Sequence, residues 1–225
     1  MAHEEIEYRI LSGAALAALV LSATGPSDPV TWFLEAVPVM IGIPLLIVTR
    51  HGFPLTPLLM RLLAFHAAVL LLGAYYTYAE VPLGAWAAEM FDLSRNHYDR
   101  FAHLIQGAVP AILTREILLR KTPLRPGGWL FVLVTCVCLA FSAFYEMIEW
   151  WSALIGGQSA DAFLGAQGDI WDSHWDMLLA LVGAIVAQLT FSRAHDRALA
   201  QLPMQICNNN QMNSREGGTF TPNIN

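Results

Sequence analysis

Ionisable residues recur at helical spacing beside three apolar stretches of the chain. The pairs are Asp99 with His103, Glu146 with Glu149, and Asp172 with Asp176. Residues three or four positions apart share one face of a helix, so each pair can present two side chains in the same direction. Carboxylates combined with an imidazole can bind a divalent cation or act as a general acid and base. The spacing therefore predicts a site of metal or proton chemistry.

The composition predicts that this site lies in a membrane protein. Of the 225 residues, 56% are hydrophobic and only 13% are charged, and the mean hydropathy is +0.48. The apolar residues form long blocks, and about 20 such residues are needed for a helix to cross a hydrocarbon layer of roughly 30 Å. Backbone groups inside a bilayer must be satisfied internally, which favours helices. We therefore expect an all-α, polytopic membrane helix bundle.

Six blocks are long enough to be spans, at 6–23, 31–49, 58–78, 99–119, 128–154 and 172–191. Pro38 and Pro44 interrupt the second block, but prolines are tolerated in bundled membrane helices. The leader MAHEEIEYR before the first block is acidic, whereas a signal peptide has a basic flank, so this block is interpreted as an anchor. We predict one six-helix domain over 1–200 and a disordered polar cytoplasmic tail over 201–225.

The distribution of basic residues predicts the orientation. With six spans, ten Lys and Arg residues fall on one side: Arg9, Arg50, Arg61, Arg115, Arg120, Lys121, Arg125, Arg193, Arg197 and Arg215. Arg95 and Arg100 alone fall on the other. Cytoplasmic segments of membrane proteins are enriched in Lys and Arg, so both termini are predicted to be cytoplasmic.

The last three blocks each carry one acid at the outer end and one ionisable residue about a turn deeper. The outer acids are Asp99, Glu149 and Asp172, and the deeper residues are His103, Glu146 and Asp176. An Asp at the bilayer centre costs roughly 2.5–3.5 kcal/mol on insertion scales, so these groups are expected to face the bundle interior. We predict a polar pocket that opens outward and requires protons, basic side chains or a metal to offset its charge.

Two sets of residues are assigned to this pocket. The predicted catalytic groups and metal ligands are Asp99, His103, Glu146 and Asp176, and the predicted substrate-binding residues are Tyr76, Arg100, Glu149, Asp169 and Asp172. Carboxylates suit Mg, Mn or Ca, and the imidazole also permits Zn, so the possible cofactor is a divalent cation.

Structural interpretations of the same residues remain open. Asp99 and His103 could form a hydrogen bond at a capped helix start. Asp169 or Asp172 could cap the sixth helix or a short turn before it. Glu149 could lie at the membrane interface. His66 is a lone imidazole in mid-span, where a hydrogen bond to a neighbouring helix is the commoner role.

Three motifs resemble the YjdF family of bacterial inner-membrane proteins, whose function is unassigned. They are HYDRFAHLIQGAVPAILTREILLR, FYEMIEWW and FLGAQGDIWDSHWDMLLALVGA, within a resemblance over residues 5–195. The resemblance implies a location in the bacterial cytoplasmic (inner) membrane.

A more distant likeness is to VanZ-like membrane proteins, which are associated with glycopeptide-antibiotic tolerance and the cell envelope. The matching positions are Asp99 and His103, then Glu146 and Glu149, then Asp176 with Gly183 and Ala184. The arginine that VanZ-like proteins tend to carry between the last two motifs has no counterpart in SALIGGQSADAFLGAQGD. The likeness implies a role at the cell envelope but no particular activity, and a lipid or envelope precursor is the ligand that we expect.

Three functional hypotheses remain after common motifs are considered. The chain has no Walker-type loop, dinucleotide fingerprint or CxxC pair, and its net charge of -6 argues against nucleic-acid binding. The first hypothesis is a membrane enzyme or binding protein for a lipid or envelope precursor. The second is a proton- or cation-coupled transporter, for which His66, Gln106 and Gln188 would continue the polar path. The third is a closed structural network in which every acid is paired.

Overall fold

The computed structural model describes residues 2–156 and 164–202, and this part of the chain is helical without strands. The elements are α1 (Ala2–Ser22), α2 (Pro29–Thr49), α3 (Pro57–Tyr76), the short 3-10 helix η1 (Tyr78–Glu80), α4 (Pro82–Met90), α5 (Tyr98–Lys121), α6 (Gly128–Gly156) and α8 (Asp172–Gln201). The prediction of an all-α fold is confirmed. From residue 203 onward, the tail predicted to be disordered lies outside the described residues.

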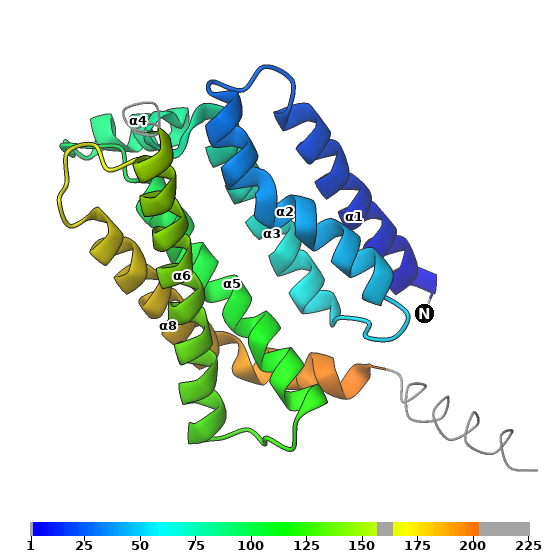
Figure 1. Ribbon diagram of the computed structural model, residues 1–225. Helices are drawn as coiled ribbons and strands as arrows, with labels where there is room; N and C mark the ends of the chain where they lie inside the picture. The colour runs from blue at the N-terminus through cyan, green and yellow to red at the C-terminus, as the bar shows by residue number, and fades with distance from the viewer. Residues whose placement is uncertain (1, 157–163, 203–225) are drawn as a thin grey trace, which may run out of the picture.

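Four helices, α2, α3, α6 and α8, are both long enough and apolar enough to cross a membrane. This finding supports a multi-pass membrane protein. Helices α1 and α5, with 21 and 24 residues, have comparable lengths. They also run between the same two ends of the bundle (Figure 1). A total of six spans and the cytoplasmic position of both termini stay predictions.

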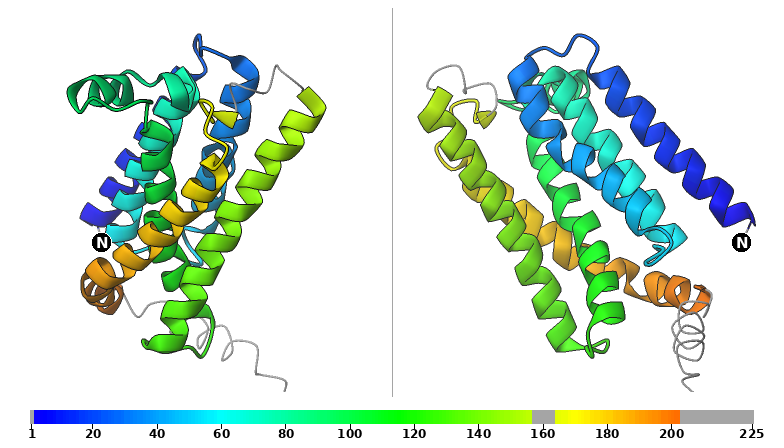
Figure 2. Two further views of the ribbon diagram at one scale, coloured as in Figure 1. Left: turned by 90° about the vertical axis from the view of Figure 1, so that its left-hand side faces the viewer. Right: turned by 45° about the vertical axis from the view of Figure 1, so that its right-hand side comes forward.

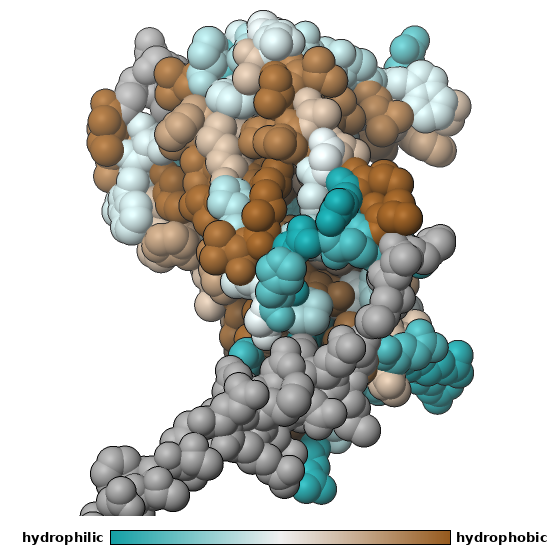
Figure 3. Space-filling model, turned by 90° about the vertical axis from the view of Figure 1, so that its right-hand side faces the viewer, coloured by the Kyte–Doolittle hydropathy of each residue, from teal (hydrophilic) through white to brown (hydrophobic). Residues whose placement is uncertain are grey.

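The two ends of the bundle differ in charge. We call one the acid-rich end, where α2 and α8 begin beside Asp28 and Asp172, and the other the arginine-rich end, where α5 finishes at Arg120 and Lys121. Both the N-terminus and the last described residues lie at the arginine-rich end (Figures 1 and 2). A space-filling view of the side on which α1 lies shows apolar side chains over much of its height and hydrophilic ones towards the arginine-rich end (Figure 3).

Local sequence signals explain where α2 and α3 begin. Asp28 precedes α2, and its Oδ1 accepts a hydrogen bond of 2.7 Å from the backbone N–H of Thr31. This N–H is the main cause of a pKa for Asp28 below the ordinary value. Thr56 caps α3 in the same way, and a proline follows each cap at the first helical position. Such proline positions cost no helical hydrogen bond.

Helix α5 lies at the centre and packs most extensively against α8, while also contacting α3 and α6. Its crossing with α8 depends on two glycines. A Cβ on Gly107 would collide with the backbone carbonyl of Ala180, and a Cβ on Gly183 would collide with that of Leu104. Small residues allow close approach of membrane helices, and here they bring α5 and α8 into backbone contact.

Candidate metal centre at the acid-rich end

The residues predicted as metal ligands come together between α5, α6 and α8. Asp99, His103 and Asp176 can each offer one ligand atom with all three atoms within 4.8 Å of one another, and His103, Glu146 and Glu149 form a second such group. His103 belongs to both groups. The structure therefore brings together all four predicted ligands and adds Glu149, which was predicted as a substrate-binding residue.

The imidazole at the centre of this cluster makes no close bond to the acids. His103 Nε2 lies 3.6 Å from Asp99 Oδ1 and 3.8 Å from Glu146 Oε1, both longer than an ordinary hydrogen bond. His103 Nδ1 is buried and has no partner. His103 is only 4% exposed, so bulk solvent has little access to these ring atoms.

Several carboxylate oxygens in the cluster are also buried without a hydrogen-bond partner. These are both oxygens of Glu146 and Oδ1 of Asp176, on residues that are 8% and 2% exposed. Buried polar groups in proteins are normally paired, and an unpaired one requires an explanation. The side chain of Ser173 on α8 interacts with Glu146, but the helices otherwise supply too few donors for these carboxyl groups.

Glu35 of α2 belongs to the same region and was not predicted as a site residue. It is 2% exposed, both of its carboxylate oxygens lack a partner, and it interacts electrostatically with Asp99 and Glu149. The signal that could have identified it is a lone acid inside an apolar span, because such residues are rare without a function.

Two arginines form an ion-paired layer above the cluster, towards the acid-rich end. Arg95 donates to Asp172 Oδ1 at 2.6 Å, and Arg100 donates to Asp169 Oδ2 at 2.5 Å. The Arg100 guanidinium also lies 5.3 Å from the ring centre of Trp175. Three predicted substrate-binding residues, Arg100, Asp169 and Asp172, therefore lie in this layer, and Arg95 is an addition that the sequence did not indicate.

Neither Asp169 nor Asp172 caps α8 itself, and of the two interpretations considered for Asp169 the cap of a short turn before the helix is the one that the structure has. The residue before α8 is Trp171, so Asp172 lies inside the first turn and does not cap the helix. Asp169 Oδ1 instead accepts from the backbone N–H of Trp171 at 2.9 Å. This bond, followed by the nearby Arg100 guanidinium, holds the pKa of Asp169 below its ordinary value. The capped start considered for α5 is also wrong, because His97 precedes the helix and provides no side-chain cap.

Residues 164–171 lie over the cluster. Asn96 donates its backbone N–H to Gln167 Oε1 at 3.0 Å, and Gln167 Nε2 donates back to the Asn96 carbonyl at 2.9 Å. Gly165 has a left-handed backbone with φ of +60°, and a Cβ there would be 3.7 Å from Asp99 Oδ2. This segment therefore packs against the start of α5 and beside Asp99.

Replacing Arg95 by methionine is expected to release this segment. Arg95 also donates to the carbonyls of Gly165 and Ala166, at 3.4 and 3.2 Å, so its loss removes three attachments and leaves Asp172 without its closest basic partner. We expect amide hydrogen exchange in 165–171 to become at least tenfold faster, while exchange in α3 stays unchanged. Equal protection of the segment in both proteins would contradict its attachment by Arg95.

Tyr76 is the one predicted site residue that lies against apolar partners. Its ring meets that of Tyr75 edge-on, with centroids 4.8 Å apart, and it packs beside the buried cluster that includes Val69 and Tyr98. Among the described residues, Tyr76 makes no hydrogen bond with any of the acids. Tyr78 of η1, by contrast, interacts electrostatically with two acids of this region, Glu35 and Asp99.

A second buried polar network, not predicted from the sequence, lies at the arginine-rich end. Glu116 is fully buried and accepts from the backbone N–H and hydroxyl of Thr56, from Arg120 and from His195, at 2.6–3.1 Å. His195 is also fully buried, and its Nδ1 lies 2.8 Å from Arg115. Arginine can only donate, so Nδ1 accepts and Nε2 carries the proton donated to Glu116. Both carboxylate oxygens and both ring nitrogens have partners.

Comparisons with known proteins agree with the expected family. The chain matches the family described as "Predicted membrane protein (DUF2238)" over residues 7–197. It is 49% identical over 193 residues to the inner membrane protein YjdF of Escherichia coli (strain K12), covering 84% of this chain and 92% of that protein. No solved structure matches the chain. The resemblance to the YjdF family and the inner-membrane location are thereby confirmed. The chain belongs to the DUF2238 family of membrane proteins, of which the YjdF protein is a relative.

Proposed function

We propose that this protein binds a divalent cation through Asp99, His103, Glu146 and Asp176 and uses it to bind, or act on, a lipid or cell-envelope precursor. The proposal includes six membrane spans with both termini in the cytoplasm, so that the acid-rich end faces outward. Asp99, His103 and Asp176 can offer ligand atoms within 4.8 Å of one another, and His103 forms a second such group with Glu146 and Glu149, which supports a cation site.

The observation that carries the proposal is the contrast between the two buried networks. At the arginine-rich end, Glu116 and His195 have partners on every polar side-chain atom. At the acid-rich end, Glu146 and Asp176 keep unpaired oxygens, and His103 is the imidazole beside them. Where buried charged groups have a structural role, as at the arginine-rich end, the protein supplies hydrogen-bond partners for them. A divalent cation would bind to the unpaired carboxylate oxygens at the acid-rich end.

A bound cation would polarise a phosphate oxygen or lower the pKa of a bound water. The chain's own residues would then position the substrate. Arg95 and Arg100, now paired with Asp172 and Asp169, are the donors suited to a phosphate, because guanidinium groups bind it in two-point geometry. Glu149 and Tyr76 retain proposed roles at the edge of the site.

Proton- or cation-coupled transport is the alternative, and the structure favours it less. Of the residues expected to continue a polar path, Gln188 donates to Thr135 and to the carbonyl of Ala184, and His66 faces a cavity on the other side of α5. A buried apolar cluster that includes Ala111, Ile112 and Val134 packs between the two ends. This packing supports a site that is closed towards the arginine-rich end.

The proposal is tested by the metal content of detergent-purified protein, measured by mass spectrometry after supply of Mg, Mn, Ca and Zn. We expect about one divalent ion per chain in the wild type and at least a tenfold loss of affinity in Asp99→Asn, His103→Ala and Asp176→Asn, because each removes a ligand. Glu89→Gln, an exposed acid on α4, serves as the matched control and should retain the ion. Metal-free, folded wild type under all four supplies would refute the cation site.

A further inference from the structure

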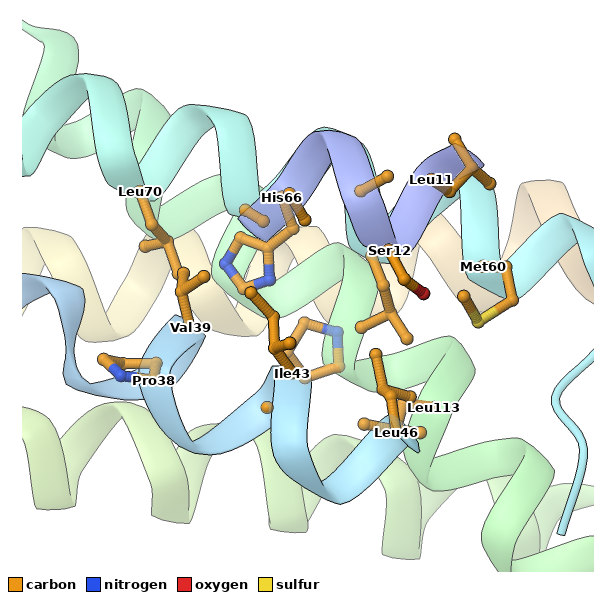
Figure 4. Close-up of a pocket in the computed structure, with 16 residues that line it drawn as sticks. Leu11, Ser12, Pro38, Val39, Ile43, Leu46, Met60, His66, Leu70 and Leu113 are labelled. Carbon is orange, nitrogen blue, oxygen red and sulfur yellow. The ribbon is translucent and has the colours of Figure 1, made fainter. Parts of the chain in front are cut away.

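A cavity of about 230 Å³ lies between α1, α2, α3 and α5, away from the acid cluster. Its lining is apolar apart from Ser12 and His66, and the close-up shows the His66 ring pointing from α3 towards Ile43 of α2 (Figure 4). His66 is nine residues from Pro57 and ten from Tyr76, so it is roughly 14–15 Å from either end of α3. The cavity is therefore at the middle depth of a spanning helix.

The two polar side chains of the lining have atoms without partners. Ser12 Oγ and His66 Nε2 are both buried and make no hydrogen bond. A serine in a helix can usually bond the carbonyl four residues earlier, which Thr49, Thr122, Thr135 and Ser152 of this chain do. Two polar atoms from different helices, α1 and α3, thus remain available to the cavity.

The size of the cavity indicates the size of the occupant. An apolar cavity of about 150 Å³ holds a benzene ring, so 230 Å³ holds a ring with substituents or a short length of chain. The volume greatly exceeds that of one water, whose share of liquid volume is about 30 Å³. Pro38 and Pro110 line the space with compact rings and Gly42 has no side chain, so these positions leave it open.

The depth and the two polar atoms indicate the chemistry of the occupant. Phospholipid oxygens lie at the bilayer surface, whereas the ring of a prenyl quinone dissolves within the hydrocarbon and carries carbonyl oxygens there. A carbonyl can accept from the Ser12 hydroxyl and from His66 Nε2 when that nitrogen carries its proton. We propose that this cavity binds the ring of a membrane-dissolved quinone through Ser12 and His66. This site is independent of the proposed cation site.

The test uses protein in nanodiscs of synthetic phosphatidylcholine and a benzoquinone carrying one prenyl unit as the probe. Binding is followed as the rise in unfolding temperature with probe concentration, since a ligand that binds only the folded state stabilises it by mass action. We expect saturable stabilisation of the wild type. His66→Phe and Ser12→Ala should each bind about tenfold more weakly, in line with the loss of one hydrogen bond.

A pair of glycine variants shows whether the probe binds inside the cavity or whether any added leucine changes binding. Gly42 lines the cavity and has open space at its Cβ, so Gly42→Leu should fill the cavity and abolish binding. Gly13 has similar open space outside the lining, so Gly13→Leu should bind like the wild type. Unchanged binding by Gly42→Leu would overturn the proposal. Equally tight binding of a cyclohexane with the same prenyl unit would also overturn it, because the oxygen would then be unnecessary.

A variant of the acid cluster shows whether the quinone site is independent of the cation site. Asp99→Asn changes the acid cluster and none of the cavity lining, so we expect it to bind the quinone like the wild type. Loss of quinone binding in Asp99→Asn would contradict the independence of the two sites.

Discussion

Gly107→Ala is expected to destabilise the protein by about 3 kcal/mol, the upper part of the usual range for overpacking a tightly packed interior. The added methyl group would meet the backbone carbonyl of Ala180, which cannot rotate away as a side chain can. The helices α5 and α8 must therefore separate. Gly183→Ala should have a similar effect, because its Cβ would meet the carbonyl of Leu104.

Separation of these helices should also disturb the candidate metal centre. Gly107 follows His103 by four residues and Gly183 follows Asp176 by seven, so each glycine is on the helix face that carries a proposed ligand. Thermal unfolding in detergent and metal content together measure both effects. Gly13→Ala and Gly42→Ala are matched controls in open space, and alanine favours a helix by about 1 kcal/mol over glycine. Gly107→Ala as stable as these controls would contradict the close crossing.

Hydropathy predicted the long helices well but missed where the last one ends. The block predicted at 128–154 matches α6, Gly128–Gly156. The block predicted at 172–191 matches the start of α8, but the helix continues to Gln201. The extra turns are polar, and they remain helical where His195 is buried against Glu116 and Asp196 pairs with Arg115. Tertiary contacts of this kind are not visible in a hydropathy pattern.

Helical spacing identified the members of the acid cluster, because depth and face follow from a rise of about 1.5 Å per residue. Spacing could not identify partners on other elements. Arg100 interacts electrostatically with Asp99 and Asp176, as expected, but its hydrogen bond goes to Asp169, and Arg95 reaches Asp172 from the connection before α5. Such pairs depend on the rotation of each helix and on the path of the loops. The Glu116 and His195 pair, 79 positions apart, was missed for the same reason.

The two buried networks are expected to respond in opposite directions when a carboxylate becomes an amide of the same shape. In Glu116→Gln, the amide N–H₂ must face at least one of the donors on Arg120, Thr56 or His195, so a charged hydrogen bond is lost and a donor is left unpaired. Bonds to charged groups contribute about 1.5–3 kcal/mol, and we expect a loss of about that size. In Glu146→Gln no hydrogen bond to a basic group is lost, the amide can keep the side-chain interaction with Ser173, and repulsion among clustered acids is relieved.

Unfolding of both variants and the wild type in detergent containing a chelator tests this expectation, because the chelator removes the contribution of a bound ion. The stability of Glu146→Gln should then equal or exceed that of the wild type, while Glu116→Gln remains less stable. Adding back the divalent ion should stabilise the wild type and leave Glu146→Gln unchanged, since the variant lacks a proposed ligand. If both variants were equally destabilised with chelator present, the acids would be a closed structural network, because only paired carboxylates lose stability when they are neutralised without an ion.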